Sequence, residues 1–136
     1  MGYMELKEKL LANDYSICTS SGYVSCERGI KPVIGPMRED LYFFKGQSAA
    51  DKIIGKASAM LLTLSGVKDV YALTISKAGQ EIFERYNIPY KYDRLVDYVI
   101  NREGNGMCPM EMTVKDIDDL KEAFEALNRK LQQLSK

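Results

Sequence analysis

The sequence predicts a single α/β domain spanning residues 1–136, and three observations lead to this prediction. The length suits one domain that buries roughly two-thirds of its unfolded surface. The composition, 46% apolar and 28% charged, is ordinary for a globular protein. Finally, the short apolar run from Val70 to Ile75 precedes a helical segment and then a second strand. That order is typical of a right-handed βαβ unit with parallel strands.

The other elements are assigned from apolar periodicity and from turn-forming residues. Leucines at helical spacing predict an N-terminal helix that ends at Asn13. A two-residue turn at Ser21-Gly22 predicts a hairpin that pairs position 18 with position 25. The expected elements are, in order, a helix at 3–12, strands at 15–19 and 23–26, a short irregular or helical segment from Lys31, a helix at 51–65, a strand at 70–75, a helix at 77–86, a strand near 90–92, a helix at 94–100, a loop at 101–107 and a helix at 116–134.

The most apolar helix is expected to open at Asp51 and to run to about Ser65. Its apolar residues cover more than one face, which predicts substantial burial. In one interpretation Asp51 is the N-cap of this helix and Lys52 lies on the solvated surface. In the other, the two residues form a polar pair at a strand-to-helix junction, where ligands collect in α/β sheets.

The last helix carries an apolar stripe with alternating spacings of three and four residues. Its members are Ile117, Leu120, Phe124, Leu127, Leu131 and Leu134. Such a stripe either packs on the parent domain or forms a coiled-coil seam. We expect packing on the domain, because the stripe is short for a coiled coil.

Charge and hydropathy argue against several classes of partner. Nineteen basic residues balance nineteen acidic ones, so no net positive charge attracts nucleic acid or an anionic membrane. No apolar run approaches the roughly 18 residues that a membrane-spanning helix needs. The amino terminus has no signal-peptide core. We therefore expect a cytoplasmic protein that binds neither nucleic acid nor membrane.

The three cysteines are an odd number in a chain without a secretion signal, so we expect no disulfide framework. Cys18 and Cys26 fall in the hairpin strands and are expected to be buried and unreactive on opposite sheet faces. Cys108 precedes Pro109 at an expected helix start, with Glu111 at the third helical position. Because a helix start acidifies a thiol, Cys108 is expected to be the reactive cysteine.

Histidine is absent, which removes the usual general base, the usual metal ligand and every Ser–His or Cys–His pair. No CxxC pair offers a zinc site either, so we expect no metal and no cofactor. The Gly-Lys pair at 55–56 does not belong to a P-loop. Ala50 and Ala57 stand where that motif needs Gly and then Ser or Thr.

Two segments resemble an uncharacterised bacterial family, the domain of unknown function 1893 family. The first is an Asp-Lys-x-x-Gly-Lys-Ala segment, formed here by Asp51, Lys52, Gly55, Lys56 and Ala57. The second is Asn-Arg-x-Gly followed by Cys-Pro-x-Glu, matched by Asn101, Arg102, Gly104, Cys108, Pro109 and Glu111. The similarity covers a core at about 13–111. It implies the cytidine-deaminase-like fold, a three-layer α/β/α sandwich around a mixed sheet, here with an extra C-terminal amphipathic helix.

The same resemblance argues against a zinc deaminase reaction. A zinc deaminase has a His or Cys, and two residues later a Glu, at the start of the helix that enters the centre of the sheet. We place Asp51 and Ile53 at those positions. The deaminase Pro-Cys-x-x-Cys follows the next strand, where this chain reads Ser76-Lys77-Ala78-Gly79. Both the metal ligands and the proton-transferring Glu are therefore missing.

Three functions remain open from the sequence. The first is a small-molecule site, whose expected lining is Asp51, Lys52, Lys56, Ser76, Asn101, Arg102, Cys108 and Glu111. The second is a non-catalytic ligand sensor that uses the same pocket. The third is a structural or partner-binding domain, and a homodimer is a further expectation.

If the site is catalytic, Cys108 is the expected nucleophile or sulfur carrier. Asp51 or Glu111 would transfer protons, and Arg102 with Lys52 would hold anions. This hypothesis places Asp51 within about 12 Å of Cys108, with both residues lining one concavity of the kind that binds small molecules.

Overall fold

A five-stranded mixed sheet forms the centre of the computed structural model, which describes residues 2–100 and 103–134. The strands are β1 (Ile17–Thr19), β2 (Val24–Ser25), β3 (Ser48–Ile54), β4 (Asp69–Ser76) and β5 (Tyr90–Val96). Their order across the sheet is β2-β1-β3-β4-β5. The strands β3, β4 and β5 are parallel, whereas β1 runs antiparallel to both of its neighbours. The predicted βαβ unit with parallel strands is therefore confirmed.

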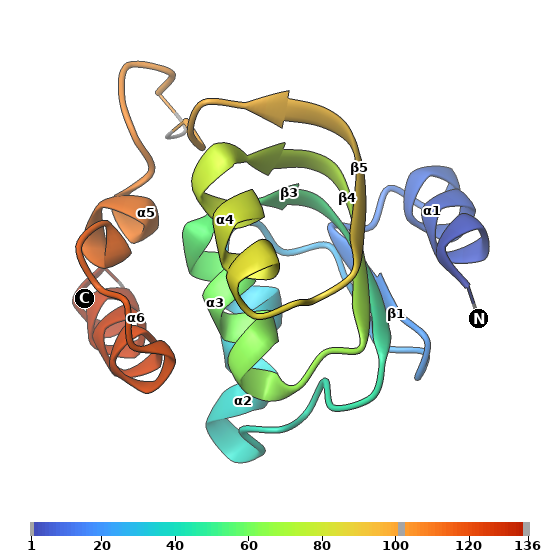
Figure 1. Ribbon diagram of the computed structural model, residues 1–136, viewed down its shortest axis with the longest axis horizontal. Helices are drawn as coiled ribbons and strands as arrows, with labels where there is room; N and C mark the ends of the chain where they lie inside the picture. Colours follow the sequence, from blue (N-terminus) through green and yellow to red (C-terminus); the bar gives the residue numbers. More distant parts are fainter. Residues whose placement is uncertain (1, 101–102, 135–136) are drawn as a thin grey trace.

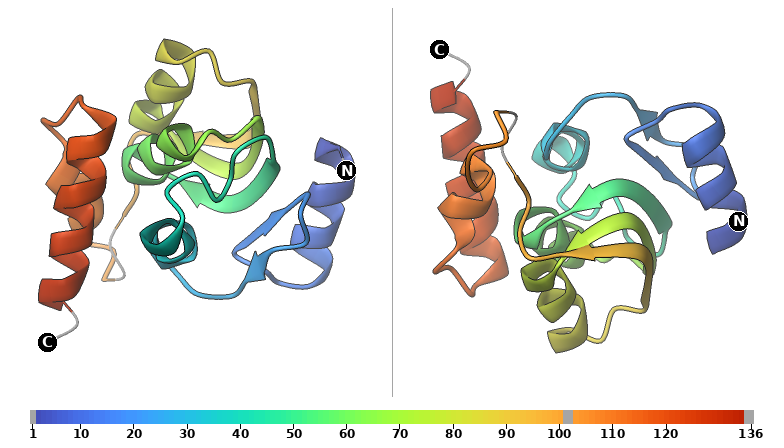
Figure 2. Two further views of the ribbon diagram at one scale, coloured as in Figure 1. Left: turned by 90° about the horizontal axis from the view of Figure 1, so that it is seen from below. Right: turned by 90° about the horizontal axis from the view of Figure 1, so that it is seen from above.

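Helices cover both faces of this sheet (Figure 1). The helices are α1 (Tyr3–Ala12), α2 (Lys31–Glu39), α3 (Lys56–Ser65), α4 (Lys77–Arg85), α5 (Pro109–Val114) and α6 (Leu120–Leu134). On one face lies α1, and on the other lie α2, α3 and α4, with α5 and α6 packed outside α3 (Figures 1 and 2). The arrangement agrees with the three-layer α/β/α sandwich that the family resemblance implies. None of the helices in the described part of the chain is long and apolar enough to cross a membrane.

The apolar core is divided by the sheet into two clusters of unequal size. The larger cluster lies between the sheet and α2, α3, α4 and α6, and includes Phe44, Met60 and Phe83. The smaller cluster lies under α1, where Leu6 and Leu10 pack against Tyr71. Because burial of apolar area is the main favourable term in folding, the larger cluster fixes how α3 and α4 lie on the sheet.

The C-terminal helix packs on the domain, as its apolar stripe predicts. The side chains of Ala123, Leu127 and Leu131 are buried, and α6 contacts α3 and α5. The helix begins at Leu120 rather than at 116. Asp119 precedes it, and its carboxylate accepts the backbone N–H of Glu122 at 2.8 Å, which satisfies one free amide of the first turn.

The prediction that a helix opens at Asp51 is wrong. Asp51 lies within β3, opposite Ile17 of β1 and Ala72 of β4. The strand continues to Ile54, and Gly55 is the N-cap of α3. The boundary between β3 and α3 is hidden in the sequence, because apolar residues continue from the strand into the helix. Pairing with β4 extends the strand to Ile54. Asp51 is therefore not a helix cap.

The predicted helix at 94–100 is also wrong, because β5 extends to Val96. The eight-residue β4 offers it backbone partners along its whole length, up to the pair Ser76 and Val96. Such pairing between segments about twenty residues apart overrides a weak local helical preference.

The hairpin forms with a different register from the predicted one. Cys18 pairs with Val24 rather than with position 25, and the Thr19 N–H donates to the Tyr23 carbonyl. The connection is thus a three-residue loop, in which Gly22 has a φ of 96° and adopts the left-handed conformation that this loop type needs. As a result Cys26 lies beyond β2 and is exposed, so its predicted burial is wrong.

Candidate functional site

A pocket of about 180 Å³ opens where the parallel strands β4 and β5 end and α3 and α4 begin. Ligands bind at this edge in open α/β sheets, because loops and helix N-termini converge there. The lining residues come from the start of α3, from α4, from the segment after β5 and from the region of α5. They are Lys56, Ser76, Ala78, Glu81, Ile82, Arg85, Asp97, Tyr98, Met107, Glu111 and Lys115.

Glu111 closes one wall of the pocket and caps α3 from another helix. Its Oε1 accepts the backbone N–H of Lys56 at 2.6 Å, and its Oε2 accepts that of Ala57 at 2.9 Å. These amides belong to the first turn of α3, where no partner within the helix is available. The sequence placed Glu111 at the third position of its own helix, but its carboxylate satisfies the start of α3, the helix that follows β3.

The environment of Glu111 has opposing effects on its acidity. The side chain is buried, with 8% of its surface exposed, and this burial raises the pKa of the carboxyl above its ordinary value. The backbone N–H groups of Ala57 and Lys56 and the charge of Lys56 act in the opposite direction. The geometry is that of a carboxylate fixed by charge-assisted hydrogen bonds at the positive end of a helix.

Ser76 lies at the end of β4 and forms the N-cap of α4. Its hydroxyl oxygen accepts the backbone N–H of Gly79 at 3.0 Å, and only 1% of the residue is exposed. Gly79 packs tightly here, because a Cβ atom on it would lie 3.1 Å from the carbonyl carbon of Gly55. The starts of α3 and α4 are thereby held side by side at the pocket.

Charged side chains of both signs surround the pocket opening. The Lys56 ammonium group donates to the carbonyl of Lys115 at 3.0 Å, which ties α3 to the end of α5. Asp97 pairs with Lys77 at 2.9 Å. The guanidinium of Arg85 lies 3.6 Å from the Asp118 carboxylate, which is longer than a close hydrogen bond. The Arg85 side chain is half exposed, so solvent screens this pair strongly.

Asp51 does not line this pocket. Asp51 belongs to the central strand β3, and only 8% of its surface is exposed. Its Oδ1 accepts the backbone N–H of Ile53 at 3.1 Å. Burial raises its pKa to about 7, although the N–H groups of Ile53 and Lys52 favour the charged form. A carboxyl group with this pKa is suited to proton transfer near neutral pH, but it lies apart from the pocket lining.

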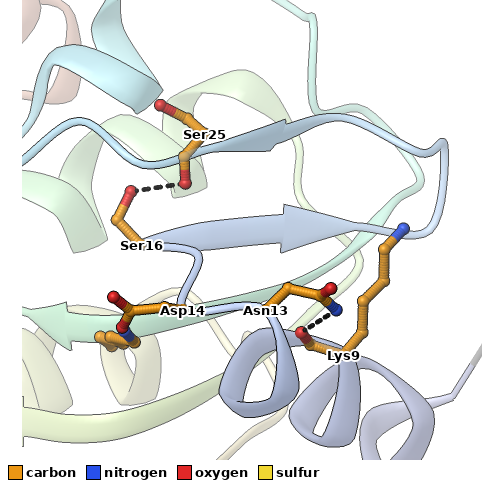
Figure 3. Close-up of polar contacts among 6 residues, drawn as sticks. Lys9, Asn13, Asp14, Ser16 and Ser25 are labelled. Atoms are coloured by element: carbon orange, nitrogen blue, oxygen red, sulfur yellow. Dashed lines mark hydrogen bonds and ion pairs between the residues drawn. The ribbon is translucent and has the colours of Figure 1, made fainter.

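Lys52 is engaged at a different place, near the end of α1. Its ammonium group forms an ion pair with Asp14, a residue with a positive φ of 55° in the turn between α1 and β1. Figure 3 shows this turn, in which the Asn13 side chain donates to the Lys9 carbonyl and the Ser16 hydroxyl donates to the Ser25 carbonyl. Lys52 is not among the pocket residues, so its predicted role in holding an anion has no support from this geometry.

Cys108 is the N-cap of α5 and Pro109 is the first helical residue, as predicted. The backbone N–H of Cys108 donates to the Val99 carbonyl at 2.9 Å, and its partly buried side chain packs on the larger apolar cluster. The pocket lining includes Met107 and Glu111 on either side of it, but not Cys108 itself. Its role as a nucleophile stays a prediction.

The structure therefore brings together three of the predicted site residues, namely Lys56, Ser76 and Glu111. Asp51, Lys52 and Cys108 lie outside the pocket lining. Asn101 and Arg102 lie outside the described residues.

Sequence reasoning missed the contribution of α4 to the pocket. Its lining residues Ala78, Glu81, Ile82 and Arg85 follow the spacing i, i+3, i+4 and i+7, which marks one face of a helix. That spacing was a usable signal. No such spacing in the sequence marks the other pocket residues Asp97, Tyr98 and Lys115. They lie after a strand or at a helix end, and only the fold brings them to the pocket.

The start of α3 lies at Gly55 and Lys56 rather than at Asp51. The residues at the helix start are Gly55, Lys56 and Ala57, which offer neither imidazole nor thiol. Among the residues that the structure describes, no group of three or more His, Cys, Asp and Glu side chains is arranged to hold a metal ion.

Comparisons with known proteins agree with this architecture. The family model described as "Domain of unknown function (DUF1893)" matches residues 5–131. The crystal structure of a DUF1893 family protein, TM1506 of Thermotoga maritima, is similar with a TM-score of 0.83 and 26% sequence identity. The match covers 96% of this chain and 92% of that one. A comparison with curated proteins finds no match.

The fold and the pocket at the ends of the parallel strands define an α/β sandwich protein with a candidate binding site. The match to the family model spans nearly the whole chain. The chain therefore belongs to the DUF1893 family, as its two motifs suggested.

Proposed function

We propose that this protein binds a small polar molecule in the pocket at the ends of β4 and β5. The observation that carries the proposal is the convergence of Arg85, Lys115, Glu81 and Asp97 around one concavity of about 180 Å³. These charges come from different elements and meet where ligands collect in α/β sheets.

The size of the pocket limits the ligand. At roughly 30 Å³ for each molecule of liquid water, 180 Å³ corresponds to the volume of about six waters. A small carboxylic acid or a small amino acid fits such a volume. Drug-sized ligands occupy larger pockets, of roughly 300–1,000 Å³, so a small ligand is the better match.

The lining offers cations that can bind an anionic group of a ligand. Arg85 presents a planar guanidinium that binds a carboxylate with two parallel hydrogen bonds. Its present partner, Asp118, lies 3.6 Å away and is exposed, so a ligand carboxylate can take its place. Glu81 and Asp97 on the same lining suit an ammonium group of the same ligand. The ligand class is accordingly a small carboxylate, with amino acids as the best-matched members.

Binding is a better match to this geometry than a reaction at Cys108. A nucleophile must reach the substrate, and the Cys108 side chain packs on the apolar cluster outside the pocket lining. Glu111, the other candidate for proton transfer, already holds two backbone N–H groups of α3. Proton transfer by Glu111 would therefore disturb a helix cap.

The test is a binding screen of the full chain with amino acids, small mono- and dicarboxylates and inorganic phosphate. Thermal shift identifies binders and isothermal titration measures their affinity. We expect Arg85→Gln and Lys115→Gln to weaken carboxylate binding at least tenfold, because each removes a cation from the lining. Arg129→Gln, an exposed change on α6, is the matched control and should leave the affinity unchanged. A lack of saturable binding across the screen, or equal effects of all three variants, would contradict the proposal.

A further inference from the structure

The outer strand β5 is long, regular and exposed. It lies at one end of the sheet and pairs with β4 on one side, and among the described residues no strand pairs with its other side. The opposite edge strand, β2, has two residues, whereas β5 has seven. Short edge strands resist pairing with other chains, and long exposed ones favour it. The two edges of this sheet therefore differ in their capacity to accept another strand.

The backbone groups that face outward on β5 follow from its hydrogen bonds to β4. The Val70 N–H donates to the Pro89 carbonyl at 3.0 Å, so this carbonyl faces β4. Backbone groups alternate in direction along a strand, and Tyr90 and Tyr92 consequently direct their N–H and C=O groups away from β4. These groups are the donors and acceptors that an added strand would meet.

Large apolar side chains are exposed on β5 and in the segment that follows it. Tyr92 is 40% exposed, and the rings of Tyr90 and Tyr92 stack with centroids 6.1 Å apart. Further along the chain Leu95 is 39% exposed, Tyr98 is 44% exposed and Ile100 is 58% exposed. Because successive side chains of a strand alternate between the faces of the sheet, Tyr92 and Leu95 lie on opposite faces of β5, so the open strand carries exposed apolar side chains on both faces.

We propose that β5 pairs antiparallel with β5 of a second copy of this chain, about a two-fold axis at Tyr92. A two-fold axis is the commonest symmetry of protein dimers, and it makes each contact occur twice. In this register the outward N–H and C=O groups of Tyr92 bond to those of Tyr92 in the second copy. The two sheets then form one continuous sheet across the dimer.

The charge pattern of β5 selects this register over its neighbours. With the axis at Tyr92, Lys91 stands opposite Asp93 of the second copy, and this juxtaposition of opposite charges occurs twice. Within its own copy the Asp93 carboxylate pairs with Lys7 at 3.0 Å, so Lys91 of the second copy would be an additional cation beside it. Tyr90 stands opposite Arg94, which suits a cation–π contact. An axis at Asp93 would place two aspartates opposite each other, and an axis at Arg94 would oppose two arginines. Like charges directly opposite each other destabilise a sheet.

Sedimentation equilibrium of the full chain, from micromolar to hundreds of micromolar, tests the association. We expect a species of twice the 15.4 kDa chain mass. Tyr92→Pro removes an N–H that points away from β4, so it should leave the fold of the monomer intact and abolish the dimer. Its thermal unfolding should shift only modestly, as the stack on Tyr90 is lost. A chain that stays monomeric at every concentration, or a dimer that Tyr92→Pro leaves intact, overturns the proposal.

Cysteine cross-linking tests the register in a Cys26→Ser background, which removes the exposed native thiol. With the axis at Tyr92, Tyr92→Cys places two thiols opposite each other, at a Cα separation that a disulfide accepts. Arg94→Cys is the matched control, because its two copies would lie about 13 Å apart along the strands. Rapid covalent dimer formation by Tyr92→Cys alone supports the register. Faster cross-linking by Arg94→Cys contradicts it.

Discussion

Gly55 and Glu111 lie so close that a Cβ atom on Gly55 would stand 2.2 Å from Oε1 of Glu111. The glycine leaves the space that the carboxylate needs to reach the N–H groups of Lys56 and Ala57. Position 55 belongs to the first motif of the sequence and position 111 to the second. The two motifs are thus joined in the fold by one helix cap, which also forms a wall of the candidate binding pocket.

Gly55→Ala should destabilise the protein by about 2–4 kcal/mol, because the added methyl group displaces Glu111 and frees two backbone N–H groups. Urea denaturation measures the loss. Gly35→Ala is the matched control. It lies within α2, and a Cβ there meets no atom within 4 Å. That change should stabilise the helix by about 0.5–1 kcal/mol. Equal losses for the two variants would refute the steric explanation.

Glu111→Ala should cost about 1–3 kcal/mol, since it leaves two amides of α3 without their partner. Amide hydrogen exchange should accelerate at Lys56 and Ala57 in particular. The control is Glu125→Ala, a change at an exposed position of α6, which should stay within about 0.5 kcal/mol of the wild type. Unchanged exchange at the two amides of Glu111→Ala would mean that the cap is not formed in solution.

Combining Gly55→Ala with Glu111→Ala gives a second test of the same contact. The double variant has no carboxylate for the new methyl group to displace. Its loss should therefore be smaller than the sum of the two single losses, a non-additivity of about 1–2 kcal/mol. Strict additivity in urea denaturation would show that the two positions act independently.

Asp51 should make stability fall as pH rises toward neutrality. Its folded pKa is about 7, above the ordinary value of 3.8, so between these values the folded state holds a proton that the unfolded state has lost. The stabilisation is complete below the lower value and is lost as pH rises through the higher one. Each unit of pKa difference corresponds to about 1.4 kcal/mol.

Asp51→Asn removes this titration. Relative to the wild type, the variant should gain about 1–3 kcal/mol between about pH 5 and about pH 8, as measured by urea denaturation. The comparison between the two proteins cancels the other titrating groups, including Glu111, whose pKa is also raised by burial. A difference that does not change over this range would contradict the raised pKa of Asp51.

The order in which the three thiols react should follow their exposure. Cys26 is exposed, Cys108 is partly buried, and the buried Cys18 thiol donates to the Leu6 carbonyl at 3.3 Å. Burial also raises the pKa of Cys18, which lowers the fraction of reactive thiolate. Timed alkylation read out by peptide mass should label Cys26 first and Cys18 last. If Cys108 reacts before Cys26 despite its lower exposure, the proposal of a nucleophile at Cys108 gains support.

Local patterns in the sequence predicted the elements that local interactions stabilise. The N-terminal helix was placed at its observed bounds because leucine spacing and Asn13 mark its face and its end. The packing of α6 followed from its apolar stripe, and the start of α5 from Pro109. Of the residues predicted for the candidate site, Lys56, Ser76 and Glu111 lie in the pocket lining, although the cap on α3 was not foreseen.

Only the tertiary structure decided the features that depend on pairing between distant segments. The ladder between β3 and β4 placed Asp51 in the sheet, and pairing with β4 extended β5 to Val96. The small residue at 55 could be read from the sequence, but its cause, the carboxylate of Glu111, lies more than fifty positions away. Local spacing determines which face of a helix is apolar, because neighbouring turns share that face. It does not determine which backbone groups a distant side chain will satisfy, because the whole packed fold sets that geometry.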